Sequence, residues 1–191
     1  AQAGSDSMLE RMRRPYTRDQ YLQLIEKMKG IIPGLSLSTD IIAGFCGETE
    51  EEHQQTLSLM REVEYDLAYM FAYSERERTL AYRKFEDDVP QEVKKRRLSE
   101  IISQQMSIQH RRNHDEIGHR HVVLVEGTSK RSEQQMSGRT DTNKIAVFDR
   151  NDFEKGDYVE VEITGATSAT LIAKPIATTS LRAYYSAVLE A

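Results

Sequence analysis

The sequence of 191 residues contains a single cysteine, Cys46, which excludes an internal disulfide framework and fits a reducing cytoplasm. No apolar stretch reaches the roughly 18–20 residues that are needed to cross a bilayer. The opening AQAGSDSMLERMRR lacks the apolar centre of a signal peptide. We therefore expect a cytoplasmic protein without a membrane partner. Because the chain starts at Ala1 and not at methionine, we expect a truncated piece of a longer protein.

The sequence also lacks the common motifs of nucleotide and metal sites, namely GxGxxG, GxxxxGK[ST], HExxH and CxxC. Its five histidines do not gather at metal-ligand spacing around Cys46. His119 and His121 would share one face of a strand, but they have too few partners for a zinc site. The residues taken alone therefore predict no catalytic constellation and no metal site.

The net charge of −5 argues against a nucleic-acid partner, but the charges are segregated along the chain. Acidic residues crowd positions 48–52 and 154–162, whereas basic residues crowd positions 76–97 and 130–144. A local basic surface is sufficient to bind phosphate, so the acidic total does not exclude RNA. We interpret the basic run at 94–97 as a solvated helix face, because Val93 and Leu98 must point inward.

The first part of the chain alternates between helical and extended patterns. Apolar spacing predicts helices over residues 17–28 and 49–63, with Thr17 and Thr49 as N-caps. Residues 35–43 and 65–73 read as strands, and a long helix follows Pro90 from 91 to about 117. This order predicts an α/β domain with a parallel sheet over residues 1–117.

After Gly118 the pattern changes to short β-like runs separated by turn residues. Five such runs lie at 121–125, 134–139, 144–148, 158–163 and 170–173, and together they predict a small β-barrel over residues 118–176. Residues 177–191 form a tail with the pattern of a loose amphipathic helix.

Several segments form an ordered set of motifs along the chain. They are QAGS at 2–5, STDIIAGFCGETEEE at 38–52, FAYSERERT at 71–79, DVP at 88–90, and MSGRT with TNK at 136–144. Together they resemble the motifs of the MiaB-type tRNA methylthiotransferases, a family of radical S-adenosylmethionine enzymes, and the resemblance runs from Gln2 to about Pro175. Cys46 stands where the family usually has proline, and Arg78 where it usually has glycine.

The resemblance implies the second half of a partial TIM-type radical barrel, followed by a small all-β TRAM domain of the OB-like kind that binds tRNA. It implies a parent enzyme that methylthiolates C2 of isopentenyladenosine next to the anticodon. The implied cofactors are S-adenosylmethionine and two [4Fe–4S] clusters. Because the cluster cysteines are absent from this sequence, we expect the chain alone to be inactive.

The same resemblance assigns site residues by position. Those expected to bind S-adenosylmethionine are Gln2, Gly4, Ser5, Ile42 and Gly44. Those expected to lie near the substrate or tRNA are Tyr73, Ser74, Arg76, Arg139, Asn143 and Lys144. From the residues alone, the turn at 44–49 is either a ligand-binding turn or an ordinary strand-to-helix connection.

Three alternatives remain open at the level of sequence. The chain could come from a sister methylthiotransferase that acts on threonylcarbamoyl-adenosine or on a ribosomal-protein aspartate. It could be a non-catalytic RNA-binding module, or an unrelated α/β protein with a β-barrel appendage. The oligomeric state and the sulfur donor are not determined by the sequence, although an incomplete sheet would expose an edge to strand exchange between copies.

Overall fold

The computed structural model describes residues 1–190, with side chains described to residue 186. The chain divides into two compact units, Ala1–Ile108 and a second unit that begins at Gln109. The division falls within helix α5 (Gln91–His114), so the last turns of this helix group with the barrel, whereas the sequence analysis placed the boundary at Gly118. No helix within residues 1–190 is both long enough and apolar enough to span a bilayer.

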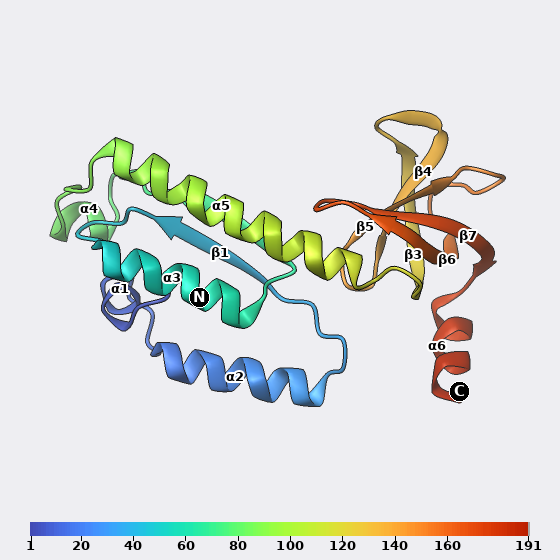
Figure 1. Cartoon of the computed structure of the whole chain (residues 1–191), viewed down its shortest axis with the longest axis horizontal. Coiled ribbons are helices and arrows are strands. Elements are labelled where there is room, and N and C mark those ends of the chain that lie inside the picture. The colour runs from blue at the N-terminus through green and yellow to red at the C-terminus, as the bar shows by residue number, and fades with distance from the viewer. Residues whose placement is uncertain (191) are drawn as a thin grey trace. The chain divides into compact units, whose positions relative to one another are not determined.

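The first unit is built around two parallel strands, β1 (Ser38–Ala43) and β2 (Leu67–Ala72). They are joined by helix α3 (Glu50–Val63), and the long helix α5 follows (Figure 1). The predicted order of helices and strands is thus confirmed. The remaining helices are α1 (Asp6–Arg11), α2 (Arg18–Ile31) and the short α4 (Leu80–Lys84), of which only α2 was predicted.

The two predicted N-caps form as expected. Thr17 and Thr49 each accept a hydrogen bond from the third residue of their helix, and the side chains of Gln20 and Glu52 bond back to the cap N–H groups. Each pair is a capping box, which satisfies backbone donors that would otherwise have no partner. Three glutamates in the first turn of α3 also complement the positive end of its dipole.

The core of the first unit lies on one face of the two-stranded sheet. Ile41 and Ala43 of β1 point to this face, where they pack in a cluster that also holds Leu57, Leu59, Met60, Val63, Tyr65, Ile101 and Ile108. On the opposite face Tyr69 and Phe71 are each 55% exposed. A single covered face explains why the strands alternate between buried and exposed residues.

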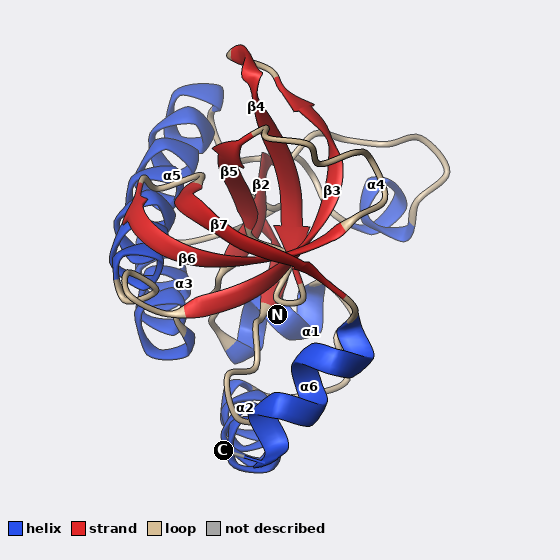
Figure 2. Ribbon diagram, turned by 90° about the vertical axis from the view of Figure 1, so that its right-hand side faces the viewer, coloured by secondary structure: helices blue, strands red, loops and turns tan. Residues whose placement is uncertain are grey.

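The second unit is a closed five-stranded barrel with the strand order β3-β4-β5-β7-β6 (Figure 2). This confirms the predicted small barrel. Its strands are β3 (Arg120–Ser129), β4 (Ser132–Thr140), β5 (Ile145–Asp149), β6 (Tyr158–Ala166) and β7 (Leu171–Thr179). Inward residues such as Val123, Met136 and Phe148 fill the interior. The tail helix α6 (Leu181–Glu190) begins later than predicted, because β7 continues to Thr179.

The interpretation of residues 94–97 as a solvated face is wrong for two of the four side chains. Lys94 and Arg97 are only 1% and 4% exposed, whereas Lys95 and Arg96 lie on the outer side of α5. The Lys94 ammonium pairs with Asp87 and lies 5.2 Å from the centre of the Tyr73 ring. Both cations are buried because each meets a carboxylate there, which offsets part of the cost of removing charge from water.

Gly44 directly follows β1, and the buried Lys94 leaves no space for a side chain at this position. Its φ is +70°, a backbone conformation that favours glycine, and a Cβ at this position would overlap the aliphatic stem of Lys94. The turn after β1 is therefore shaped by the packing of α5 against it.

We predict that Gly44→Ala lowers the free energy of unfolding by about 2–4 kcal/mol, from the left-handed backbone and the overlap with Lys94. Gly30→Ala is the matched control, because Gly30 lies within α2 and has open space around it. That change should stabilise by about 0.5–1 kcal/mol. Urea unfolding followed by circular dichroism measures both. Equal effects of the two substitutions would contradict the packing argument.

Candidate functional site

The ends of the two parallel strands form the edge at which a site is expected. Ala43 of β1 lies opposite Ala72 of β2, and the Tyr73 N–H donates to the Ala43 carbonyl at 2.8 Å. Residues that follow the two strands therefore emerge side by side. In α/β folds this carboxyl edge is where ligands bind.

A hollow of about 400 Å³ opens beside the end of β2, and we call it the β2-end hollow. It brings together five of the residues that the family resemblance assigned, with Asp40 and Phe71 as further lining: Gln2, Ile42, Tyr73, Ser74 and Arg76. Positions that the resemblance assigned to the cofactor and positions that it assigned to the substrate thus line one concave surface.

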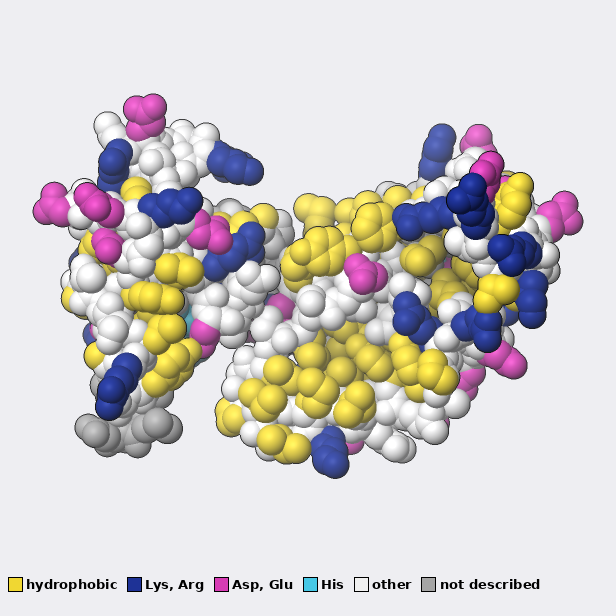
Figure 3. All heavy atoms as spheres, turned by 180° about the vertical axis from the view of Figure 1, so that it is seen from behind, with side chains coloured by type: hydrophobic (Ala, Val, Ile, Leu, Met, Phe, Trp, Pro, Cys, Tyr) yellow, Lys and Arg dark blue, Asp and Glu magenta, His cyan; other side chains and the backbone are white. Residues whose placement is uncertain are grey.

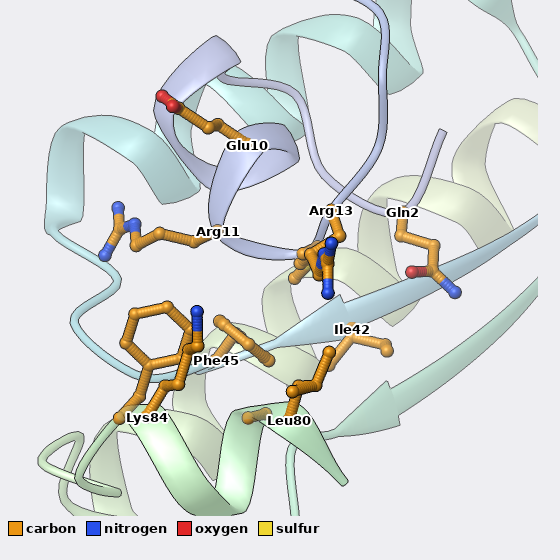
Figure 4. A pocket seen from close by; sticks show the side chains of 11 residues that line it. Gln2, Glu10, Arg11, Arg13, Ile42, Phe45, Leu80 and Lys84 are labelled. Atoms are coloured by element: carbon orange, nitrogen blue, oxygen red, sulfur yellow. The ribbon is translucent and has the colours of Figure 1, made fainter.

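A second hollow of about 520 Å³ lies between α1 and α4, and we call it the α1–α4 hollow (Figure 4). Gln2 and Ile42 line this hollow as well as the β2-end hollow. The rest of its wall is both basic and apolar, and sequence reasoning did not single it out. Its further lining residues are Glu10, Arg11, Met12, Arg13, Phe45, Leu80, Ala81, Lys84 and Phe85.

Three of the five residues assigned to S-adenosylmethionine line neither hollow. The Gly4 N–H donates to Thr56 Oγ1 at 2.9 Å, and a Cβ on Gly4 would meet the backbone of Gln55. The Ser5 hydroxyl accepts from the Met8 N–H at 3.1 Å and caps α1. Gly44 packs under Lys94, as described above. These residues set the path of the backbone around the hollows and present no side chain to them.

Tyr73 connects the strand ends to a buried aromatic cluster. Its ring packs edge-on against Phe45, with centroids 4.8 Å apart, and Phe45 in turn contacts Phe85. Burial is the main cause that raises the pKa of Tyr73 to about 12, and the neighbouring Cys46 thiol raises it further. The buried hydroxyl makes no hydrogen bond of normal geometry. Tyr73 is therefore a neutral phenol at physiological pH.

The residues of this chain do not fit an iron–sulfur cluster. Cluster iron is held by several cysteine thiolates, and Cys46 is the one cysteine in the sequence. It is 3% exposed, and burial raises the pKa of its thiol. Cys46 thus behaves as a small apolar residue in the packing behind the strand ends.

Glu50, His53 and Glu100 place their ligand atoms within 4.8 Å of one another. A cation already lies between them, because Arg96 bonds Glu50 at 2.6 Å and Glu100 at 2.7 Å. The hydrogen bond from Arg96 is the main cause that lowers the pKa of Glu50 to about 2. The guanidinium thus takes the place of a metal ion, and this cluster is an ion-pair network.

In the barrel, Arg139 and Asn143 form one polar corner. An Arg139 Nη1 donates to the side-chain oxygen of Asn143 at 2.9 Å, and its Nε pairs with Glu126 at 3.3 Å. The Arg139 side chain is 40% exposed, so part of the guanidinium faces solvent. Asn143 has a φ of 63°, which fits its position in the turn between β4 and β5.

Lys144 differs from Arg139 in its surroundings. Its ammonium pairs with Glu116 at 2.6 Å and bonds the Arg112 carbonyl at 3.3 Å, and its side chain is 9% exposed. Glu116 also pairs with His121 at 2.9 Å. Lys144 therefore fastens β5 to the segment that follows α5, and it has little surface left for a ligand.

We predict that Cys46 resists alkylation while the protein is folded. A buried thiol with a raised pKa forms little thiolate at neutral pH. Iodoacetamide at about pH 7.5 should leave the native protein unmodified, as measured by intact-mass spectrometry. In about 8 M urea, which unfolds the chain, the reagent should label Cys46 fully. Rapid labelling of the native protein would show that the thiol is accessible.

Glu116 makes the stability of the barrel depend on pH. The hydrogen bond with His121, followed by Lys144, lowers the pKa of this carboxyl to about 2. A folded-state pKa below the unfolded one stabilises above about pH 4.5, and this contribution is lost as the pH falls toward 2. Between pH 6 and pH 3 the barrel should lose about 2 kcal/mol more than its Glu116→Gln variant does.

Hydrogen exchange of β3 to β7 amides at the two pH values measures this loss. Glu126→Gln is the control, because Glu126 is 51% exposed in its pair with Arg139 and such pairs contribute about 0–1 kcal/mol. If Glu116→Gln changes with pH as the unsubstituted protein does, the pair with His121 and Lys144 is not the cause.

Residues 116–176 match the family model described as TRAM domain. A tRNA-2-methylthio-N(6)-dimethylallyladenosine synthase of Chlorobium phaeobacteroides is 53% identical over 91% of this chain and 39% of its own length. A CDK5RAP1-like protein of Oryza sativa is 48% identical over 97% of the chain and 33% of its own length. The human mitochondrial tRNA methylthiotransferase CDK5RAP1 is 46% identical over 95% and 32%.

The chain thus spans less than two fifths of the length of each of these relatives. Each match covers at least nine tenths of the chain, so it extends over both units. The chain is therefore a homologue, along nearly all of its length, of the MiaB-type tRNA methylthiotransferases, and its barrel is a TRAM domain.

Proposed function

We propose that this chain is part of an enzyme that adds a methylthio group to C2 of isopentenyladenosine next to the anticodon of tRNA. The observation that carries the proposal is 53% identity, over nine tenths of the chain, to a protein named for this reaction. The arrangement of the site agrees with it, because cofactor-side and substrate-side positions line one hollow at the carboxyl edge of β1 and β2.

In this proposal β1, α3 and β2 are consecutive pieces of a partial TIM-type barrel. Gln2 and Ile42, on the wall shared by the two hollows, would hold the adenosine part of S-adenosylmethionine by an amide and an apolar contact. Tyr73, Ser74 and Arg76 would face the nucleoside substrate. When bound, S-adenosylmethionine would supply radical chemistry that no side chain of this chain provides.

This sequence has a single cysteine, so in this proposal the cysteines that hold the iron–sulfur clusters lie outside it. The role of this chain is then to bind and orient. Its neutral Tyr73 and the apolar floor beside it would keep water away from the reacting base.

The second unit would bind the tRNA. Small β-barrels can bind nucleic acid through one face and its loops, and Arg139 has a half-exposed guanidinium beside the polar turn at Asn143. Binding of RNA by the barrel alone is the second candidate function, since the TRAM match does not depend on either hollow. The names of the relatives favour isopentenyladenosine over the acceptors of sister families.

We predict that Arg139→Ala weakens tRNA binding, whereas Lys144→Ala weakens the fold. Loss of one phosphate contact should lower the affinity roughly 3- to 10-fold and reduce the salt slope by about 1. Lys144→Ala leaves Glu116 without its lysine and should lower the melting temperature while folded protein binds tRNA normally. Fluorescence anisotropy with labelled tRNA at several salt concentrations, paired with thermal melts, distinguishes the two.

The proposal for the barrel is contradicted if the protein binds no tRNA, or if its affinity does not depend on salt. A normal affinity of Arg139→Ala would instead move the contact to another face of the barrel.

A further inference from the structure

The α1–α4 hollow carries two cations that have no partner among the described residues. Arg13 and Lys84 are exposed, and neither side chain forms a hydrogen bond or ion pair with another side chain or with the backbone in the described part of the chain. Figure 4 shows both side chains directed into the hollow from opposite sides, whereas the Glu10 carboxylate points away from it. Arg11, also in the wall, is neutralised by Glu52.

Arg13 holds an unusual backbone conformation. It follows the C-cap of α1 with a φ of 59°, a left-handed position that glycine normally fills. The Arg14 N–H bonds the Leu9 carbonyl across this turn, so the conformation is fixed by the end of the helix. Arginine in this left-handed conformation stabilises the fold less than glycine would. Its guanidinium, however, places a positive charge in the hollow.

The floor between the two cations is apolar and partly aromatic. Phe45 and Leu80 lie there, as Figure 4 shows, together with Phe85. A volume of about 520 Å³ admits a nucleotide-sized group. Cations beside an apolar, aromatic floor are what single-stranded nucleic acid requires, since phosphates meet the cations and a base or ribose meets the floor.

More unpaired cations continue outward from the hollow along the segment that contains α4. Arg76, Arg78 and Arg83 are exposed and have no ion-pair partner among the described side chains. Figure 3 shows Lys and Arg side chains gathered at this end of the first unit. Glu75, Glu77 and Glu86 also lie in the segment, so the surface is mixed outside the hollow and is cationic within it.

We propose that the α1–α4 hollow binds the backbone of an unpaired RNA strand, with Arg13 and Lys84 on successive phosphates. The first unit would then contact the tRNA by itself, next to the β2-end hollow in which the target nucleoside is proposed to lie. The choice of RNA as the binding partner rests on the proposed function. A strand fits better than a membrane surface, because the cations line a concavity and the apolar groups form its floor.

The test compares Arg13→Gly/Lys84→Ala with Lys27→Ala/Lys95→Ala in the full chain. Both variants lose two exposed lysine or arginine charges, and Lys27 on α2 and Lys95 on α5 lie on elements that do not line the hollow. Binding of an anticodon stem-loop RNA is measured by anisotropy over a series of salt concentrations. The first variant should bind roughly 10- to 100-fold more weakly, with a salt slope reduced by about 1.4.

Stability distinguishes a binding role from a structural one. Glycine relieves the left-handed backbone at position 13, so the melting temperature of Arg13→Gly/Lys84→Ala should equal or exceed that of the unsubstituted protein. Weaker RNA binding by an equally stable protein is the result that supports the proposal.

Equal affinities of the two double variants would overturn it. If Arg139→Ala still weakens binding in that case, the proposed function of the barrel stands and this inference alone fails. If the unsubstituted protein binds no RNA, both fail. Salt-sensitive binding to phosphatidylserine vesicles that depends on Arg13 and Lys84, without RNA binding, would assign the hollow to a membrane surface instead.

Discussion

The first unit depends on two cations that α5 carries into its interior. Arg97 bonds both the carbonyl and the carboxylate of Glu48, at 2.8 and 3.0 Å, and Lys94 pairs with Asp87. Burial raises the pKa of Glu48, while the Gly44 N–H and Arg97 oppose that rise. Removing one member of such a buried pair costs about 3–5 kcal/mol. These pairs fix the turn after β1 and the segment after β2, and thereby the walls of both hollows.

The barrel is also held by ion pairs of partly buried side chains, although fewer residues take part. Glu116 holds His121 and Lys144, so that β3 and β5 are both fastened to the segment after α5. Arg139, whose partners leave it 40% exposed, keeps a surface for contact with solvent and ligand. Arg139 and Lys144 lie five positions apart in one motif but have different roles. Lys144 is buried by its partners and holds the barrel together, whereas Arg139 stays partly in contact with solvent.

Local patterns in the sequence were sufficient for most of the fold. Threonine caps and apolar spacing located α2 and α3, and turn residues divided the barrel into its strands. The short helices α1 and α4 carry too few residues for a periodic pattern. The burial of Lys94 and Arg97 could not be read from spacing, because hydropathy assigns charged residues to solvent. It depends on Asp87 and Glu48, and only the fold shows that these carboxylates meet the two cations. Motifs supplied Gln2, Gly4 and Ser5 together, but only packing shows that Gly4 and Ser5 turn toward α3 and α1.

The distribution of partners also explains how an acidic protein can offer cationic sites. Buried or half-buried basic side chains such as Lys94, Arg97 and Lys144 are paired with carboxylates, so the opposite charges largely cancel outside the molecule. Arg13 and Lys84 have no such partner among the side chains that the structure describes, so their charge remains available at the surface of the hollow. Phosphate binding responds to this local charge and not to the total of −5. Hence the pairing pattern, which depends on the three-dimensional structure, decides which of the basic residues can meet RNA.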